Sequence, residues 1–408
     1  MKMNSNWIPL FSTNFLGVLN NNFLKNVIIF MSLTLLVQKN YGLIVSLASG
    51  LYVIPYIFFS PIGGRLAKTH RKSSIMFWSK VTELPLFMLS CVGFMLHSIY
   101  IVLFCIFGVG LISTLFSPSK YGLIRDIGGD EGISFGTGTL EMFTFLGVLL
   151  ATFLASVLAD HYSHQVFSVV IISLSIVQIV VSRMLGKIEE TQTIEVKDDT
   201  LNPVTFFIQS FRWAKTIPNA NIIILGLSTF WMLGSLILMN LMVHCNQVLK
   251  MTKTETGIVM NISAIGIGLG SYFTGVLSHR KVNLGFTPIG AFGMMFCFAA
   301  LFILRPHGLN FSAIILLTSF FSGMFMVPLS SWVQHSVEGR LQGDMLAYSN
   351  FVIFLLIVIS AVLFNPVVSI FGTNGVWLLM FVIVLVVLST MLLNVKEMWQ
   401  RTLTLTKI

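Results

Sequence analysis

Charged residues are scarce in this chain of 408 residues: Asp, Glu, Lys and Arg make up 10% of it. Soluble domains carry about 25% charged residues. Because 55% of the chain is apolar, no soluble fold of this length could bury all of its apolar side chains. We therefore expect an integral membrane protein.

The alternation of apolar and polar residues that marks a membrane-spanning β-strand is also missing. The apolar runs are instead continuous, as at 376–388. Continuous runs of about 20 apolar residues predict membrane-spanning helices. The expected fold is an all-α integral membrane protein with twelve transmembrane helices in two six-helix halves. The predicted spans lie at roughly 7–37, 42–67, 74–96, 98–118, 134–159, 163–187, 217–243, 254–278, 284–304, 309–336, 343–370 and 374–395.

Patterns of catalytic or metal-binding residues are absent as well. No catalytic triad, phosphate-binding loop or His-x-x-x-x-Asp acyltransferase box occurs. We therefore expect no enzyme, no catalytic residue, no metal and no cofactor. The four cysteines lie inside apolar runs and lack the spacing of metal ligands: Cys91, Cys105, Cys245 and Cys297.

Most basic residues fall on one side of the predicted helices. By the positive-inside rule, that side and both termini are expected to be cytoplasmic. The net charge of +9 then needs no nucleic-acid partner, because basic helix ends attract membrane lipid. The main basic clusters lie at 65–72, 120–125, 183–215, 280–281 and 396–407.

The longest polar stretch divides the chain. Within it, Asn202 followed by Pro203 predicts a short helix at the membrane surface, with a plain linker as the alternative. The predicted parts are an N-terminal half at 1–187, a cytoplasmic linker at 188–216, a C-terminal half at 217–396 and a cytoplasmic tail at 397–408.

Two landmarks repeat at nearly one offset. His-Arg-Lys occurs at 70–72 and again at 279–281, which is 209 residues later. Pro118 precedes Pro328 by 210 residues. The common offset indicates two similar halves, and in an apolar chain it is typical of transporters built from parallel repeats.

Two six-helix halves with a basic turn after the second helix of each resemble the major facilitator superfamily. The loop 64–72 is similar to that family's loop motif, although Lys68 replaces the usual Asp. In the family, this Asp is thought to contact a helix end and latch one conformation, so Lys68 puts that contact in doubt. We expect the turn residues to fix topology and support the hinge side of each half: Gly64, Arg71, Lys72, Arg280 and Lys281.

The segment Ser117-Pro-Ser-Lys-Tyr-Gly122 resembles the Ser-Pro-Ala-Lys-Tyr-Gly motif of bacterial lysophospholipid transporters in this superfamily. The resemblance implies inward flipping of lysophospholipids, especially lysophosphatidylethanolamine, across the inner membrane. A separate cytoplasmic acyltransferase would then re-acylate them. Three positions lack the family's charge and could alter head-group preference: Asn21, Leu238 and Ile353.

Ionisable and strongly polar residues inside membrane spans are costly, so each is a candidate for function. Asn22, Lys25 and Asn26 share one helical face that could hold phosphate, although Asn side chains also bond between helices. Position alone gives Lys120 a topological role, whereas the resemblance places it in a recurring motif. The expected substrate-binding residues are Asn21, Asn22, Lys25, Lys120, Glu141, Asn240 and Asn261.

Several further interpretations stay open. Lys80 and Glu83, three positions apart, predict an ion pair on one helix at the membrane edge. Glu141 could pair with a lysine, meet an ethanolamine amine, or serve a proton-linked exporter of small amphiphiles. Alternatively, the chain could be a non-transporting adaptor that docks an acyltransferase through 188–216.

Overall fold

The computed structural model describes residues 6–35, 41–160, 163–188, 201–278 and 281–405, and all regular structure within them is helical. The expected all-α fold is therefore confirmed. The helices are α1 (Trp7–Leu35), α2 (Tyr41–Thr69), α3 (Lys72–Met95), α4 (Ile99–Asp160), α5 (His164–Arg183), η2 (Met184–Lys187), α6 (Pro203–Ala214), α7 (Ala220–Gln247), α8 (Lys253–Leu277), α9 (Phe286–Leu304), α10 (Gly308–His335), η3 (Gly339–Leu341), α11 (Gln342–Asn394) and α12 (Lys396–Leu405).

Two helices are long enough to cross a membrane twice. α4 has 62 residues and α11 has 53, whereas one crossing needs about 20. Gly129 (φ 57°, ψ −166°) interrupts α4, and Gly372 (φ 67°, ψ 178°) interrupts α11. Only glycine adopts this backbone conformation readily, so each glycine divides its helix where the sequence predicts a gap between spans.

The count of membrane-crossing segments follows from these breaks. Eight helices of the described chain, including α4 and α11, are long and apolar enough to cross a membrane. The helices α1 and α2 have 29 residues each. With α4 and α11 counted twice, the described residues contain twelve helical segments of crossing length.

The chain forms two compact units, to which α4 and α11 both contribute. The division into halves at 1–187 and 217–396 stays a prediction, because each compact unit also contains a short segment from the other predicted half. Unit 1 comprises residues 1–127, 146–210 and 337–350, and unit 2 comprises 128–145, 211–336 and 351–408.

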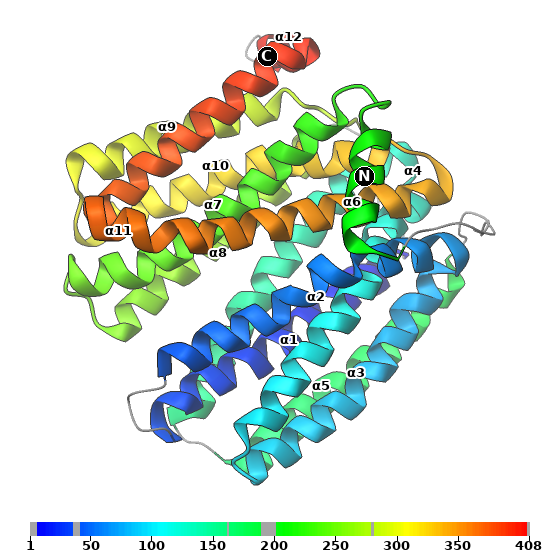
Figure 1. Cartoon of the computed structure of the whole chain (residues 1–408), viewed down its shortest axis with the longest axis vertical. Coiled ribbons are helices and arrows are strands. Elements are labelled where there is room, and N and C mark those ends of the chain that lie inside the picture. Colours follow the sequence, from blue (N-terminus) through cyan, green and yellow to red (C-terminus); the bar gives the residue numbers. More distant parts are fainter. Residues whose placement is uncertain (1–5, 36–40, 161–162, 189–200, 279–280, 406–408) are drawn as a thin grey trace. The chain divides into compact units, whose positions relative to one another are not determined.

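Unit 1 packs α1, α3, α5 and parts of α4 around a buried apolar cluster (Figure 1). At its centre, the rings of Phe94 and Phe167 meet edge to face with their centroids 4.5 Å apart. Phe23 stacks on the other side of this pair, 5.8 Å from Phe167. Because lipid tails are as apolar as these rings, it is the close packing of the cluster that joins the four helices.

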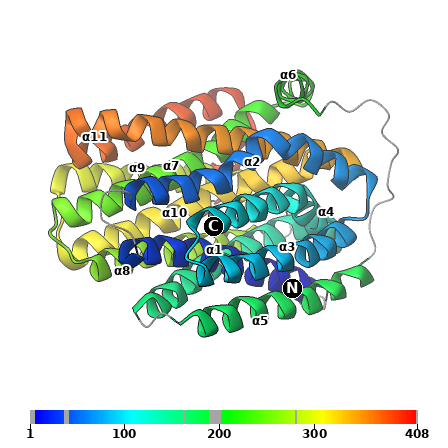
Figure 2. The same ribbon diagram turned by 60° about the horizontal axis from the view of Figure 1, so that its bottom comes forward.

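In unit 2, α7, α8 and α9 pack against α10 (Figure 2). The approach of α8 to α10 is especially close. A Cβ atom added to Gly266 would lie 2.6 Å from the Leu316 carbonyl oxygen, and one added to Gly323 would lie 2.6 Å from that of Ile267. The glycine-rich eighth predicted span therefore serves helix packing, as small residues do in membranes.

Two helices, α6 and α12, are too short to cross a membrane. α6 begins at Pro203, and the Asn202 Oδ1 atom accepts hydrogen bonds from the backbone of Val204 (3.0 Å) and Thr205 (3.2 Å). Its position at a membrane surface stays a prediction. α12 was not predicted from the sequence. Its Thr402 hydroxyl donates a hydrogen bond to the Gly285 carbonyl at 3.0 Å.

The basic turn after α2 is held by specific contacts. Lys68, which replaces the family's Asp, forms a 2.7 Å ion pair with Asp344 in the first turn of α11. The Arg340 Nη1 atom donates to the carbonyls of Ala67 (3.0 Å) and His70 (2.8 Å). The loop therefore contacts the start of α11 through an ion pair in which the loop supplies the cation.

The other turn residues have separate roles. A Cβ atom on Gly64 would lie 2.9 Å from that of Ala347, so Gly64 allows α2 to approach α11. Arg71 donates to the Ile188 carbonyl at 3.4 Å. In the second turn Lys281 is exposed, and Arg280 lies outside the described residues. The topogenic role of these residues stays a prediction.

Candidate functional site

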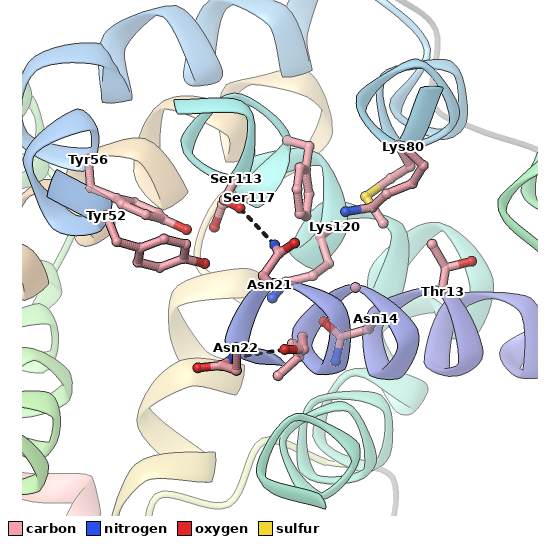
Figure 3. Close-up of a pocket in the computed structure, with 14 residues that line it drawn as sticks. Thr13, Asn14, Asn21, Asn22, Tyr52, Tyr56, Lys80, Ser113, Ser117 and Lys120 are labelled. Atoms are coloured by element: carbon pink, nitrogen blue, oxygen red, sulfur yellow. Dashed lines mark hydrogen bonds between the residues drawn. The ribbon is translucent and has the colours of Figure 1, made fainter. Parts of the chain in front are cut away.

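A cavity lies within unit 1, between α1, α2, α3 and α4 (Figure 3). The lining residues are Thr13, Asn14, Gly17, Val18, Asn21, Asn22, Tyr52, Tyr56, Met76, Lys80, Ser113, Phe116, Ser117 and Lys120.

Three of the sequence-predicted site residues line this cavity: Asn21, Asn22 and Lys120. The Asn21 amide donates to the Ser113 hydroxyl at 3.3 Å, which links α1 to α4. Lys25 is not among the lining residues, but its ammonium lies 5.8 Å from the ring centre of Tyr52, which is one of them. The structure thus gathers most of the predicted residues of unit 1 at one place.

Other asparagines of α1 serve helix packing. Asn20 donates to the Ser175 hydroxyl of α5 at 2.7 Å. Asn26 donates to the Thr152 hydroxyl of α4 at 2.9 Å. These contacts agree with the interpretation that Asn side chains bond between helices. Asn20 and Asn26 therefore serve helix packing, whereas Asn21 and Asn22 line the cavity.

The pair of Lys80 and Glu83 is present, as its spacing predicted, and it is deeply buried. The Lys80 Nζ atom lies 2.9 and 3.1 Å from the two Glu83 carboxylate oxygens. Both side chains are 1% exposed. Lys80 also lies over the Phe116 ring, 3.9 Å from its centre, and lines the cavity.

The motif at 117–122 contributes to the cavity and to its support. The Ser117 hydroxyl accepts a hydrogen bond from the Asn350 amide at 3.0 Å, and the Lys120 ammonium lies 4.5 Å from the Tyr121 ring centre. Gly122 leaves room for Lys72, whose Cε atom would be 2.9 Å from an added Cβ. Lys72 thereby reaches Asp126, four residues beyond the motif's last glycine, at 2.8 Å.

The predicted site residues of unit 2 are placed separately. Glu141 is buried, and Asn261 in α8 is half-buried. Asn240 in α7 is fully buried, and neither of its side-chain polar atoms has a hydrogen-bond partner among the described residues. Their role in substrate binding stays a prediction.

Sequence reasoning missed several lining residues, chiefly Tyr52, Tyr56, Lys80 and Ser113. Tyr52 and Tyr56 are four positions apart, which places both hydroxyls on one face of α2. Figure 3 shows these two tyrosines on the opposite side of Asn21 from Lys80. Two phenols at helical spacing inside an apolar span were the available signal.

The electrostatics of the cavity favour an anionic ligand. Two of the fourteen lining residues, Lys80 and Lys120, are cations, and none of the fourteen is a carboxylate. Amides and hydroxyls supply further hydrogen-bond donors, while Val18, Met76 and Phe116 give an apolar surface. A phosphate bound here could receive charge-assisted hydrogen bonds.

Comparison with known proteins agrees with the fold. The chain is 23% identical to the lysophospholipid transporter LplT of Serratia proteamaculans, over 84% of this chain and 85% of the relative. It is 24% identical to the LplT of Yersinia enterocolitica, over 84% of each chain. The structure of the human organic anion transporter MFSD10 has the same fold, with a TM-score of 0.74 and 13% identity, covering 93% of this chain and 100% of that one.

The family model of the Major Facilitator Superfamily matches residues 10–361. This superfamily consists of multi-pass membrane transporters, so the expectation that the chain is not an enzyme is confirmed. The match, the helical fold and the twelve crossing segments lead to one conclusion: the chain belongs to the major facilitator superfamily.

Proposed function

We propose that the protein transports lysophospholipids of the lysophosphatidylethanolamine type from the outer to the inner leaflet of a bacterial inner membrane. The observation that carries the proposal is the cavity of unit 1, with its two lysines and no carboxylate among the fourteen lining residues. A lysophospholipid offers an anionic phosphate for the lysines, glycerol hydroxyls for the amides and an acyl chain for the apolar side.

The relatives support this substrate class. Those from Serratia and Yersinia are named lysophospholipid transporters, and they match over most of their length. The motif Ser117-Pro-Ser-Lys-Tyr-Gly122, through which the chain resembles them, supplies two cavity-lining residues, Ser117 and Lys120.

Transport by alternating access, with both termini in the cytoplasm, completes the proposal. The transported lipid would then be re-acylated by a separate cytoplasmic acyltransferase. Asn21, Asn22 and Lys120 contact the head group in this account, and Lys25, Glu141, Asn240 and Asn261 are proposed as further substrate-contacting residues.

The test is translocation of a fluorescent lysophosphatidylethanolamine in liposomes that contain the purified protein. The wild type should move the lipid between leaflets, and movement no faster than in empty liposomes would overturn the proposal. Lys120→Ala should lower the rate by about 10- to 100-fold, the equivalent of one charge-assisted hydrogen bond. Lys215→Ala is the control, because Lys215 is an exposed lysine outside the cavity.

A further inference from the structure

The Lys80 side chain lines the cavity and is held by Glu83, which is not a lining residue. Its Nζ atom lies 2.9 and 3.1 Å from the Glu83 carboxylate oxygens. The Gln178 amide of α5 donates to Glu83 Oε2 at 3.2 Å. Lys80 lines the cavity, whereas Glu83 and Gln178 are not among the lining residues. Figure 3 shows the Lys80 nitrogen directed toward Asn21.

This geometry leaves Lys80 able to bind a ligand. A lysine ammonium has three N–H donors, and the contacts to Glu83 among the described residues occupy two of them. Its remaining face lies over the Phe116 ring, which also lines the cavity. A phosphate oxygen that enters the cavity can accept the third N–H.

Stability does not explain why an ion pair occupies this wall. Replacing a buried ion pair by apolar side chains of similar volume is often neutral or stabilising. Ionisable residues inside membrane spans therefore indicate function, particularly where one partner reaches a cavity.

Gly17 of α1 lies against the same group. A Cβ atom at this position would lie 3.2 Å from the Lys80 Nζ atom and 3.0 Å from the Gln178 Nε2 atom. A side chain on Gly17 would therefore press on the cation and on the amide that holds its partner. Gly17 keeps this part of the wall free for the ammonium.

We propose that Lys80 is a phosphate-binding residue of the cavity, with Glu83 and Gln178 as positioning residues and Gly17 as the residue that leaves room for it. The proposal rests on the proposed function and identifies the residues that bind and position the phosphate of the lipid head group. An uncharged monoacylglycerol with the same acyl chain lacks the group that Lys80 binds.

The main test removes both charges together, so that no buried charge is left unpaired. Lys80→Met/Glu83→Met should lower the translocation of lysophosphatidylethanolamine about 10- to 100-fold, as expected for a lost charge-assisted hydrogen bond. Excess unlabelled lysophosphatidylethanolamine should then inhibit the residual movement no better than monoacylglycerol does. A wild-type rate with wild-type discrimination between these two competitors would overturn the inference.

The control is the double variant Lys72→Met/Asp126→Met. It removes another buried ion pair of unit 1, whose residues do not line the cavity. This variant should keep the wild-type rate and discrimination. Loss of both in the control, to the same degree as in the cavity variant, would show that the pairs serve folding alone and would contradict the inference.

A smaller perturbation avoids any change of charge. Gly17→Ala should weaken transport and discrimination, whereas Gly50→Ala should leave both unchanged because no atom lies within 4 Å of its added Cβ. Equal behaviour of these variants would count against the inference. Wild-type protein that moves no lipid would instead overturn the proposed function, so the two failures are distinguishable.

Discussion

The two compact units differ in where they place charge. In unit 1, the ion pairs of Lys80 with Glu83 and of Lys72 with Asp126 are buried, with every partner at most 4% exposed. In unit 2, the pair of Arg401 and Glu397 lies at the surface, 45% and 69% exposed. Burying charge is costly, and of the two buried pairs only that of Lys80 contributes a residue to the lining of the cavity.

Around His244, the interior of unit 2 is joined by neutral polar and aromatic groups. The His244 ring bonds to the Thr373 hydroxyl at 2.8 Å and stacks on Phe311, 5.6 Å between centroids. Trp377 meets the same ring at its edge, with centroids 5.9 Å apart. Such a core joins helices without drawing an ionic ligand.

The repeated prolines show the same contrast in sequence. Pro118 lies within α4 of unit 1 and is followed by Ser-Lys-Tyr-Gly, which includes the cavity residue Lys120. Pro328 lies within α10 of unit 2 and is followed by Leu-Ser-Ser-Trp. The two prolines lie 210 positions apart, but the residues that follow them differ in chemistry.

Breaking one buried pair of unit 1 should have the largest effect on stability. Asp126→Ala leaves the Lys72 ammonium buried without its carboxylate, and this should lower the free energy of unfolding by about 3–5 kcal/mol. Thermal unfolding in detergent measures the loss. Lys72→Met/Asp126→Met should restore most of it, and a double variant as unstable as the single one would contradict this account.

The pair between α2 and α11 should matter less, because Asp344 is 21% exposed. Lys68→Ala should lower the free energy of unfolding by about 2 kcal/mol, as for a hydrogen bond to a charged group. The exchanged variant Lys68→Asp/Asp344→Lys should recover part of this stability. Unfolding at the same temperature in all three proteins would show that the pair adds nothing.

A change in unit 2 should have the opposite sign. Asn240→Leu removes a buried amide that has no hydrogen-bond partner among the described residues, so it should raise the free energy of unfolding by about 1–2 kcal/mol. If Asn240 contacts substrate as proposed, lipid translocation should fall at the same time. A destabilised protein would show that the amide has a structural partner.

The smallest effect is expected at Thr373. Thr373→Val removes one neutral hydrogen bond to His244 and should lower the free energy of unfolding by about 1 kcal/mol. Transport should stay unchanged. A loss as large as that of Asp126→Ala would remove the contrast between the units.

Local patterns in the sequence predicted much of this structure. Continuous apolar runs predicted the helices, and the breaks at Gly129 and Gly372 fall between predicted spans. The spacing of Lys80 and Glu83 predicted their ion pair. Each of these features depends on residues that are neighbours in the chain.

Features that depend on distant residues were not predictable in the same way. Lys72 and Asp126 are 54 positions apart, and Lys68 and Asp344 are 276 positions apart. The lining by Tyr52 and Ser113 requires α2 and α4 to face one another. Periodicity identifies the faces of a helix, whereas the choice of neighbour comes from packing of the whole unit.

The most direct test of the central claim is competition in liposomes that contain the wild-type protein. Translocation of fluorescent lysophosphatidylethanolamine is followed with an excess of unlabelled lysophosphatidylethanolamine or of monoacylglycerol with the same acyl chain. This account predicts strong inhibition by the phosphate-bearing lipid and little by the uncharged one. Equal inhibition by the two would contradict a cavity that selects phosphate.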